Sequence, residues 1–318
     1  MKLCTSTGDY SGYVSTITEK IRHFKGSPFR YINLEQTGTN PAFLSDDENL
    51  WQHMAEEWGE AGVYAGVEFV VSHSPIINPF DKLNEDTYQH ALRAARRSIE
   101  ICHRLNILRI VVHASQNPTF TAAEFARQNK RFYSDLFDLM ERYSITVMTE
   151  NVDDGAIYTP LSTGQEMREF IEYVDHPLFA GCWDTAHANI NKKAKADGFY
   201  KCLTDIGDKL KGLHISDNLG DGAHHHSWPF AGIINFDAVM QGLLDAGYDG
   251  YFTFEASYTL LHHTNMPYNR KPWVHEGETV TKLLDPPVWL KKKAVELLYE
   301  TGKYILETYN CFEEGIIT

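Results

Sequence analysis

Short apolar runs alternate eight times with longer amphipathic stretches along this chain, and this rhythm constrains the fold more than any other feature. The runs are rich in Val, Ile, Phe or Tyr and lie at residues 2–6, 30–35, 66–73, 109–113, 145–150, 178–184, 212–216 and 251–255. Several are almost wholly apolar, which is typical of strands covered on both faces. Strands that alternate with helices favour a parallel sheet.

The stretches between these runs have the spacing of helices. In the stretch after the third run, apolar residues recur at intervals of three and four, at Tyr88, Ala91, Leu92, Ala95, Ile99 and Cys102. The next stretch opens with Thr121 and carries Glu124 three residues later, which is the pattern of a capping box. A last helix is predicted from about Val288, directly after two prolines.

Eight such units in 318 residues predict a closed (β/α)8 TIM barrel that forms one α/β domain over residues 1–318. A doubly wound open sheet is the alternative. It would carry a glycine-rich phosphate-binding turn after a strand, and none of the eight runs is followed by one. The barrel is therefore the expected fold, with its active site at the carboxyl ends of the strands.

Residue types that bind metals gather at the ends of six successive runs. They are His73, His113, Glu150, Asp184 with His187 three residues further on, His214 and Glu255. In a barrel these ends meet at one rim. Charged and imidazole side chains are costly to bury there unless something binds them. Two glutamates, an aspartate and one or more histidines suit Mn, Co, Mg, Zn or Fe(II), since no cysteine joins the set.

The histidines around this set leave alternatives open. His73, His113 and His187 orient a substrate, hold a second metal or serve as hydrogen-bonded structural residues. Residues 224–226 are three histidines in a row, which either form a solvated loop or face the rim. The connection from Glu255 to the last helix is long, which is typical of a lid or a substrate-binding segment.

Composition argues against several classes of protein. Lys and Arg number 29 against 43 Asp and Glu, and the resulting net charge of −14 disfavours a protein whose task is to grip nucleic acid. No apolar run approaches the ~18 residues of a membrane span, and the first residues lack the apolar stretch of a signal peptide. The five cysteines form no close pairs. We therefore expect reduced thiols, a cytoplasmic protein, and neither nucleic acid nor a membrane as partner.

Five phrases at the rim carry a family resemblance through their order and spacing. They are EN at 150–151, WDTAHAN at 183–189, LHISDN at 213–218, a His-x-His-x-x-Pro-x-x-Gly run from 224, and GYDGYFTFE at 247–255. Together they resemble the xylose isomerase-like TIM barrel superfamily, and within it the sugar phosphate isomerase/epimerase and AP endonuclease family 2 branch. The resemblance extends over nearly the whole chain.

This resemblance implies a metal site and a mechanism. The implied ion is one divalent metal, expected to be Mn2+, with Co2+, Mg2+, Zn2+ and Fe2+ as alternatives. Its implied ligands are Glu150, Asp184, His214 and Glu255. The implied catalytic residues are Glu150, Glu255 and His187, and the implied substrate-binding residues are His73, His113, His187 and His226. The two glutamates would act as acid and base beside a carbonyl, and the metal would stabilise the enediolate that forms.

The predicted function is therefore a metal-dependent isomerase or epimerase that acts on a small-molecule sugar or sugar conjugate, as a homo-oligomer or with a small partner subunit. The main alternative is the catalytic subunit of a C-glycoside deglycosidase, a lyase on 3-oxo sugar conjugates that needs such a partner subunit. An AP endonuclease-type phosphodiesterase and a non-catalytic sugar-binding barrel are disfavoured alternatives.

Two departures from the family patterns bear on these alternatives. The endonucleases carry an aspartate-x-histidine pair after the seventh strand, and here His224 stands in place of the aspartate. With the net charge of −14, this argues against DNA repair. Tagatose epimerases carry an arginine about six residues after the metal histidine, and here that position is Gly220. The sequence therefore indicates no particular sugar.

Overall fold

The computed structural model describes residues 1–36, 40–152, 160–264 and 270–315, which form a barrel of eight parallel strands. The strands are β1 (Lys2–Ser6), β2 (Tyr31–Glu35), β3 (Glu68–His73), β4 (Arg109–Val111), β5 (Thr146–Glu150), β6 (Phe179–Asp184), β7 (Leu210–His214) and β8 (Tyr251–Thr253). Their order is β7-β6-β5-β4-β3-β2-β1-β8. The ring is completed where Ile215 N donates to the Thr253 carbonyl (2.8 Å) and Glu255 N donates to the Ile215 carbonyl (3.1 Å). The predicted (β/α)8 barrel is confirmed.

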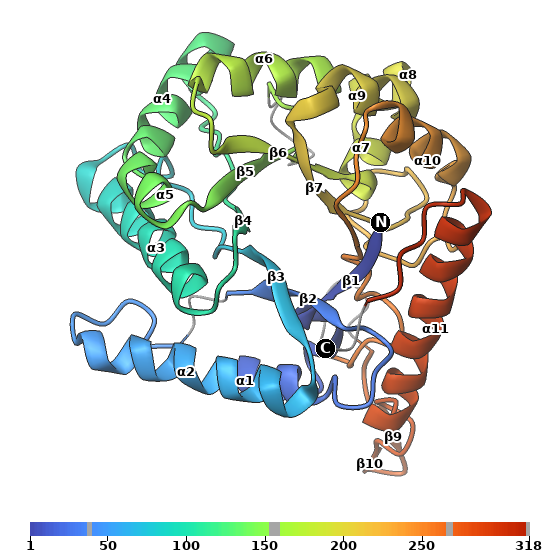
Figure 1. Ribbon diagram of the computed structural model, residues 1–318. Helices are drawn as coiled ribbons and strands as arrows, with labels where there is room; N and C mark the ends of the chain where they lie inside the picture. The colour runs from blue at the N-terminus through green and yellow to red at the C-terminus, as the bar shows by residue number, and fades with distance from the viewer. Residues whose placement is uncertain (37–39, 153–159, 265–269, 316–318) are drawn as a thin grey trace.

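Helices surround this barrel (Figure 1). They are α1 (Ile17–Arg22), α2 (Glu48–Ala65), α3 (Glu85–Arg104), α4 (Ala122–Ser134), α5 (Phe137–Tyr143), α6 (Gly164–Val174), α7 (Thr185–Ile190), α8 (Lys192–Asp197), α9 (Phe199–Ile206), α10 (Phe236–Asp245) and α11 (Val288–Thr308), with 3-10 turns η1 (Thr7–Tyr10) and η2 (Gly207–Lys209). The predicted capping box is present, because Thr121 Oγ1 accepts from Glu124 N and the Glu124 carboxylate accepts from Thr121 N. Helix α11 begins directly after Pro287, as predicted.

Three strands end two residues earlier than the sequence suggests, and for β7 this makes His214 the last residue of the strand. Strand β4 stops at Val111 and β8 at Thr253, so His113 and Glu255 each lie two residues beyond a strand rather than at its last position. The ladders explain the difference. Strand β8 pairs with β1 only over Lys2 to Cys4, and the last bond to β1 runs from Phe254 N to the Cys4 carbonyl, after which Glu255 N donates to the Ile215 carbonyl. Both side chains still reach the carboxyl-end rim.

Alternate residues of the strands face the barrel interior. Below the rim, a small cluster of buried side chains fills it: Cys4, Tyr31, Val71, Val111, Met148, Ala180 and Cys182. The other strand residues, such as Leu3, Ile32 and Val147, join the large core under the helices. Continuing this alternation by two residues brings His73, His113, Glu150 and Asp184 to the interior at the rim, and in β2 two such steps lead from Tyr31 to Glu35. All five cysteines are free thiols, which agrees with the expectation of no disulfides.

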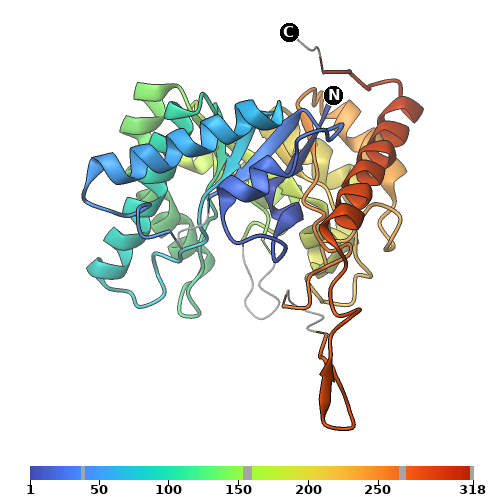
Figure 2. The same cartoon turned by 90° about the horizontal axis from the view of Figure 1, so that it is seen from below.

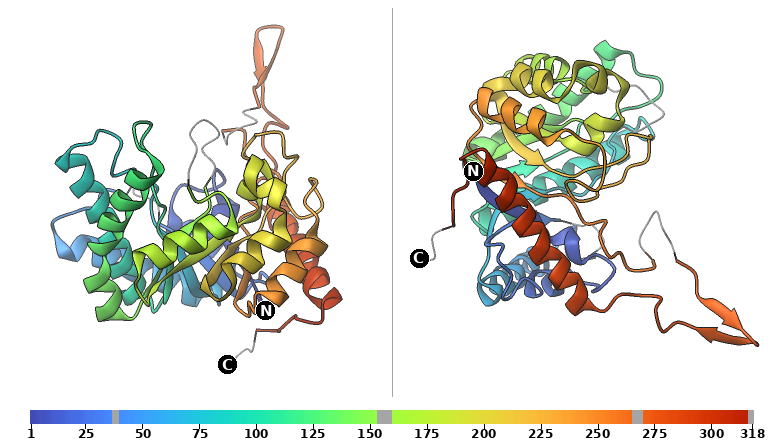
Figure 3. Two further views of the ribbon diagram at one scale, coloured as in Figure 1. Left: turned by 90° about the horizontal axis from the view of Figure 1, so that it is seen from above. Right: turned by 90° about the vertical axis from the view of Figure 1, so that its right-hand side faces the viewer.

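The long connection after β8 forms a hairpin of its own. Strands β9 (Trp273–His275) and β10 (Glu278–Val280) pair antiparallel and project away from the body of the barrel (Figures 2 and 3). Glu255, at the start of this connection, lines the cavity at the rim, but none of the described residues between Glu255 and α11 does. The hairpin therefore does not cover the rim in this arrangement. Among the helices of the described ranges, none has the length and apolar character needed to cross a membrane.

Candidate functional site

Four predicted metal ligands come together at the carboxyl-end rim. Glu150, Asp184 and His214 are the last residues of β5, β6 and β7, and Glu255 follows β8. One ligand atom from each lies within 4.8 Å of the others. The side chains of the first three are at most 1% exposed, whereas that of Glu255 is 26% exposed. Neighbouring parallel strands bring together residues that are far apart in the chain.

The polar atoms of this group fit a bound cation. Glu150 Oε1, Asp184 Oδ2 and both ring nitrogens of His214 are buried without a hydrogen-bond partner. Such atoms are costly to bury unless a ligand satisfies them. Three carboxylates and one imidazole form an oxygen-rich donor set that suits a hard or borderline divalent ion.

A buried cysteine lies closer to this group than the sequence suggested. The Sγ atom of Cys182 is within 4.8 Å of ligand atoms of Glu150 and His214. Burial raises the pKa of the Cys182 thiol to about 12, with the negative charges of Glu150 and Asp184 adding to the effect and His214 opposing it. Burial therefore favours the neutral thiol, while the position of Cys182 with Glu150 and His214 adds a sulfur atom to the atoms that could contact an ion.

His73 and His113 form a second group with Glu150. Their Nε2 atoms are 2.9 Å apart, and Nε2 of His113 lies 3.1 Å from Glu150 Oε2. Nδ1 of His73 donates to the Ser74 carbonyl at 2.7 Å, which leaves its Nε2 as the nitrogen that faces Glu150. These two predicted substrate-binding residues therefore lie directly beside the predicted metal ligands.

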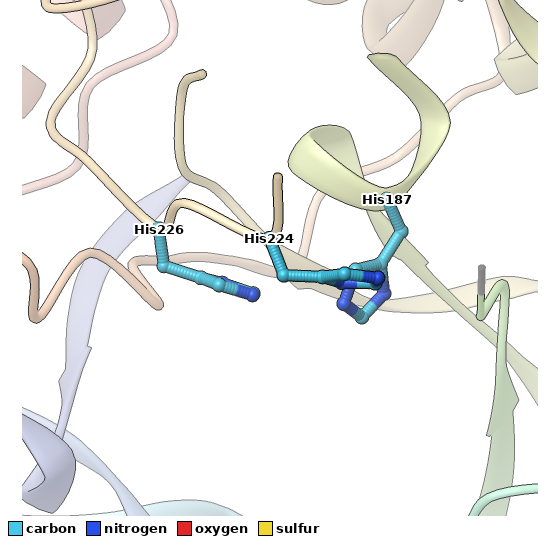
Figure 4. A group of neighbouring side chains, drawn as sticks. All are labelled: His187, His224 and His226. Atoms are coloured by element: carbon cyan, nitrogen blue, oxygen red, sulfur yellow. The ribbon is translucent and has the colours of Figure 1, made fainter. Parts of the chain in front are cut away.

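A third group contains His187, His224 and His226 (Figure 4). Nδ1 of His187 donates to the Asn151 carbonyl at 2.9 Å, and Nδ1 of His226 lies 3.2 Å from the Glu255 carbonyl. A backbone carbonyl on Nδ1 leaves Nε2 as the ring nitrogen that can contact a ligand, an arrangement common among metal-binding histidines. The sequence left open whether residues 224–226 form a solvated loop or face the rim. The structure favours the second alternative for His224 and His226.

Local hydrogen bonds hold the third group to the first. Asp184 Oδ1 accepts from His187 N at 2.6 Å and so caps helix α7, while Asp184 Oδ2 faces the metal ligands. Asn151 joins β5 to β6, because its side chain bonds to both the N–H and the carbonyl of Asp184 at 2.6 and 2.8 Å. Residues of the EN and WDTAHAN phrases are thus joined to each other by hydrogen bonds in one network.

Burial and mutual charge set the protonation of these residues. Burial alone would raise the pKa of both Glu150 and Glu255. The charge of His214 instead holds both pKa values well below 4.5. His113 adds to this effect at Glu150, and His226 adds to it at Glu255. Burial would lower the pKa of His187, but Asp184 and Glu150 raise it to about 10. Both glutamates are therefore anionic near neutral pH, as a base and as a metal ligand must be.

The rim encloses a cavity of about 640 Å³. Its lining includes His73, His113, Glu150, His187, His224, His226 and Glu255. It also includes residues that the sequence did not indicate: Glu35, Gln36, Ser74, Pro75, Ile76, Ile77 and Val152. Glu35 could have been found, because it ends the second strand just as Glu150 ends the fifth. Nothing in the sequence distinguishes the apolar lining residues from other apolar residues of the chain.

The chain belongs to the xylose isomerase-like TIM barrel family, whose model matches residues 26–279. An uncharacterized protein of Methanocaldococcus jannaschii, MJ1311, is 27% identical over 194 residues, which are 59% of this chain and 64% of that protein. The chain thus matches less than two thirds of this relative's length. This match confirms the family resemblance that was inferred from the five phrases at the rim.

Solved structures share the fold over nearly their full length. D-psicose 3-epimerase of Clostridium cellulolyticum H10, solved with D-tagatose, has a TM-score of 0.70 at 16% identity and covers 96% of this chain and 99% of its own. The IOLI protein, solved with a bound zinc atom, has a TM-score of 0.65 at 16% identity, with 97% and 99% covered. At these identities the likeness is one of fold.

Proposed function

We propose that this protein is a divalent-metal-dependent epimerase or isomerase of a keto sugar. One observation carries the proposal: Glu150 and Glu255, from opposite sides of the β6–β7 pair, converge on the same nitrogen, Nδ1 of His214, at 3.0 and 3.1 Å. Two carboxylates that share a cation site and face one cavity are suited to move a proton on and off carbon. The epimerase and zinc-bound neighbours support this reading.

The residues that would hold the ion are Glu150, Asp184, His214 and Glu255. When bound, a divalent cation would polarise a carbonyl and offset the negative charge that develops when an adjacent proton leaves. The oxygen-rich set is compatible with Mn2+, which is the ion we propose, and with the other ions of similar hardness.

The glutamates would carry the protons. Both are ionised near neutral pH, so either can accept a proton from the carbon next to the carbonyl. The other, once protonated, would return a proton to the opposite face of that carbon for epimerisation, or to its neighbour for isomerisation. His187 Nδ1 lies 3.3 Å from Glu150 Oε1 and would stabilise the anionic form of that base.

The histidines would orient the sugar. His73, His113 and His226 line the cavity around the glutamates and present imidazole nitrogens to it. Imidazole both donates and accepts hydrogen bonds, which matches the hydroxyl groups of a sugar. We therefore propose a substrate held by histidines on both sides of the reacting carbon.

The proposal is tested with protein stripped of metal by a chelator and then reconstituted. Ketohexoses, ketopentoses and 3-oxo glucosides are incubated with each form, and products are identified by NMR. We expect the reconstituted protein to convert at least one keto sugar and the stripped protein to convert none. A protein that binds no divalent ion, or a loaded protein that converts none of the panel, would overturn the proposal. Cleavage of the 3-oxo glucosides in place of epimerisation would favour the lyase.

A further inference from the structure

We propose that Glu35 is a substrate-binding residue that selects an uncharged, hydroxyl-rich sugar over a phosphorylated or carboxylated one. This inference rests on the proposed function, because it concerns the same cavity. Glu35 belongs to neither the metal ligands nor the acid–base pair, and it approaches the cavity from the far strands of the barrel.

The strand register places Glu35 at the cavity wall. Glu35 is the last residue of β2 and pairs with His73 of β3 across the sheet. Residues Tyr31 and Asn33 of the same strand are buried, and Tyr31 belongs to the cluster that fills the barrel interior. Alternation along the strand therefore turns Glu35 inward as well, and its side chain lines the cavity beside His73.

The end of β1 holds the Glu35 carboxylate in place. Ser6 Oγ donates to Glu35 Oε1, and Glu35 N donates to Thr7 Oγ1 at 3.0 Å. Gly8 gives the carboxylate room, because a Cβ atom there would lie 2.4 Å from Oε1 and 2.8 Å from Oε2. A fixed carboxylate with one oxygen occupied is a directed hydrogen-bond acceptor.

The second oxygen is available to a ligand. Within the ranges that the structure describes, no group donates a hydrogen bond to Glu35 Oε2, and no lysine or arginine forms an ion pair with this carboxylate. A sugar hydroxyl could donate to it. A phosphate or carboxylate group could not, since both are acceptors and negatively charged.

The rest of the cavity points to the same selection. Its lining carries the carboxylates of Glu35, Glu150 and Glu255, and among the described lining residues there is no lysine or arginine. The sequence of residues 37–39, 153–159 and 265–269 contains no lysine or arginine either. Sites that bind phosphate use such cations or backbone N–H groups at a helix N-terminus. The cavity therefore suits a neutral polyol.

The test compares Glu35→Gln with the wild type in the metal-loaded protein. The substrates are the keto sugar that the wild type converts fastest and the phosphate ester of that sugar. We expect the substitution to raise KM for the neutral sugar about tenfold, since a hydrogen bond to a charged group is lost, with kcat and metal content unchanged. The preference for the neutral sugar over its phosphate ester should fall by about the same factor.

A second variant moves the carboxylate without removing it. Gly8→Ala forces the flexible end of Glu35 to shift and should raise KM in the same direction, whereas Glu57→Gln on the exposed face of α2 should change nothing. If the wild type is active and Glu35→Gln has the same KM and the same preference for the neutral sugar, the inference about Glu35 is wrong, while the proposed function still stands. A metal-loaded wild type that converts no sugar would overturn the proposed function and with it this inference.

Discussion

Nδ1 of His214 lies 3.0 Å from Oε2 of Glu150, yet the two atoms do not form a hydrogen bond of acceptable geometry. Both side chains are 1% exposed, so the pair is shielded from bulk water. Close approach of a carboxylate oxygen and a ring nitrogen without a hydrogen bond is compatible with two ligands of one ion. This relationship underlies the predictions about metal and catalysis.

Replacing Glu150 with glutamine should remove turnover. The amide keeps an oxygen for the metal but cannot accept the proton, so we expect kcat to fall by about a thousandfold while part of the metal remains bound. Kinetics with elemental analysis of the same preparation checks both parts. Glu57→Gln, on the exposed face of α2, is the matched control. Near-normal activity of Glu150→Gln would show that the acid–base assignment is wrong.

Two histidine substitutions test how many ions the rim binds. We expect one tightly bound divalent ion per chain, held by the group that contains His214. His214→Ala should therefore weaken metal binding by more than about 100-fold, since a buried ligand is lost. His224→Ala removes an exposed member of the three-histidine group and should leave the tight ion in place. Titration calorimetry with Mn2+ gives the stoichiometry, and a wild-type value above one would contradict the single-ion prediction.

Asp9 should make stability depend on pH in a defined direction. Burial raises its pKa from 3.8 to about 6, although Lys291 and a hydrogen bond from Thr5 oppose the rise. The folded state therefore binds the proton more tightly than the unfolded state does. This contribution to stability is fully present below pH 3.8 and is lost as the pH rises through 6.

The Asp9→Asn variant isolates that contribution. Relative to the variant, the wild type should lose about 2 kcal/mol of unfolding free energy between pH 4 and pH 7, at 1.36 kcal/mol for each unit of pKa shift. Urea unfolding of both proteins across this range measures the difference. Parallel pH curves for the two proteins would mean that Asp9 titrates alike in the folded and unfolded states.

Gly164 should be intolerant of any side chain. A Cβ atom at this first residue of α6 would lie 1.8 Å from the carbonyl oxygen of Cys202 in α9, and backbone cannot rotate away as a side chain can. Gly164→Ala should therefore cost more than about 2 kcal/mol. Gly59→Ala within α2 meets only Leu105 Cδ2 at 3.3 Å and gains helix propensity, so it should be neutral or stabilising. Equal unfolding midpoints for the two variants would contradict this account of α6–α9 packing.

The sequence predicted the barrel because its strands are short apolar runs of regular spacing, and it predicted the rim because parallel strands end at one edge. Glu150, Asp184 and His214 were placeable on these grounds. Glu35 belongs to none of the five rim phrases, but the same rule would have placed it at the rim, and the structure adds that it lines the cavity. The bonds that fix the histidine tautomers, such as His187 to the Asn151 carbonyl, depend on tertiary contacts that spacing does not encode. The hairpin of β9 and β10 was missed because its strands are too short to show a period.

The most direct test of the central claim is exchange of substrate hydrogen with solvent deuterium. Metal-loaded protein is incubated in D2O with ketohexoses, ketopentoses, inososes and 3-oxo glucosides, and NMR locates the deuterium. We predict incorporation at a carbon next to the carbonyl of at least one sugar, lost on chelation and in Glu150→Gln. Conversion of a sugar without any deuterium incorporation, or incorporation that persists in the chelated protein, would contradict proton transfer by these glutamates at a metal site.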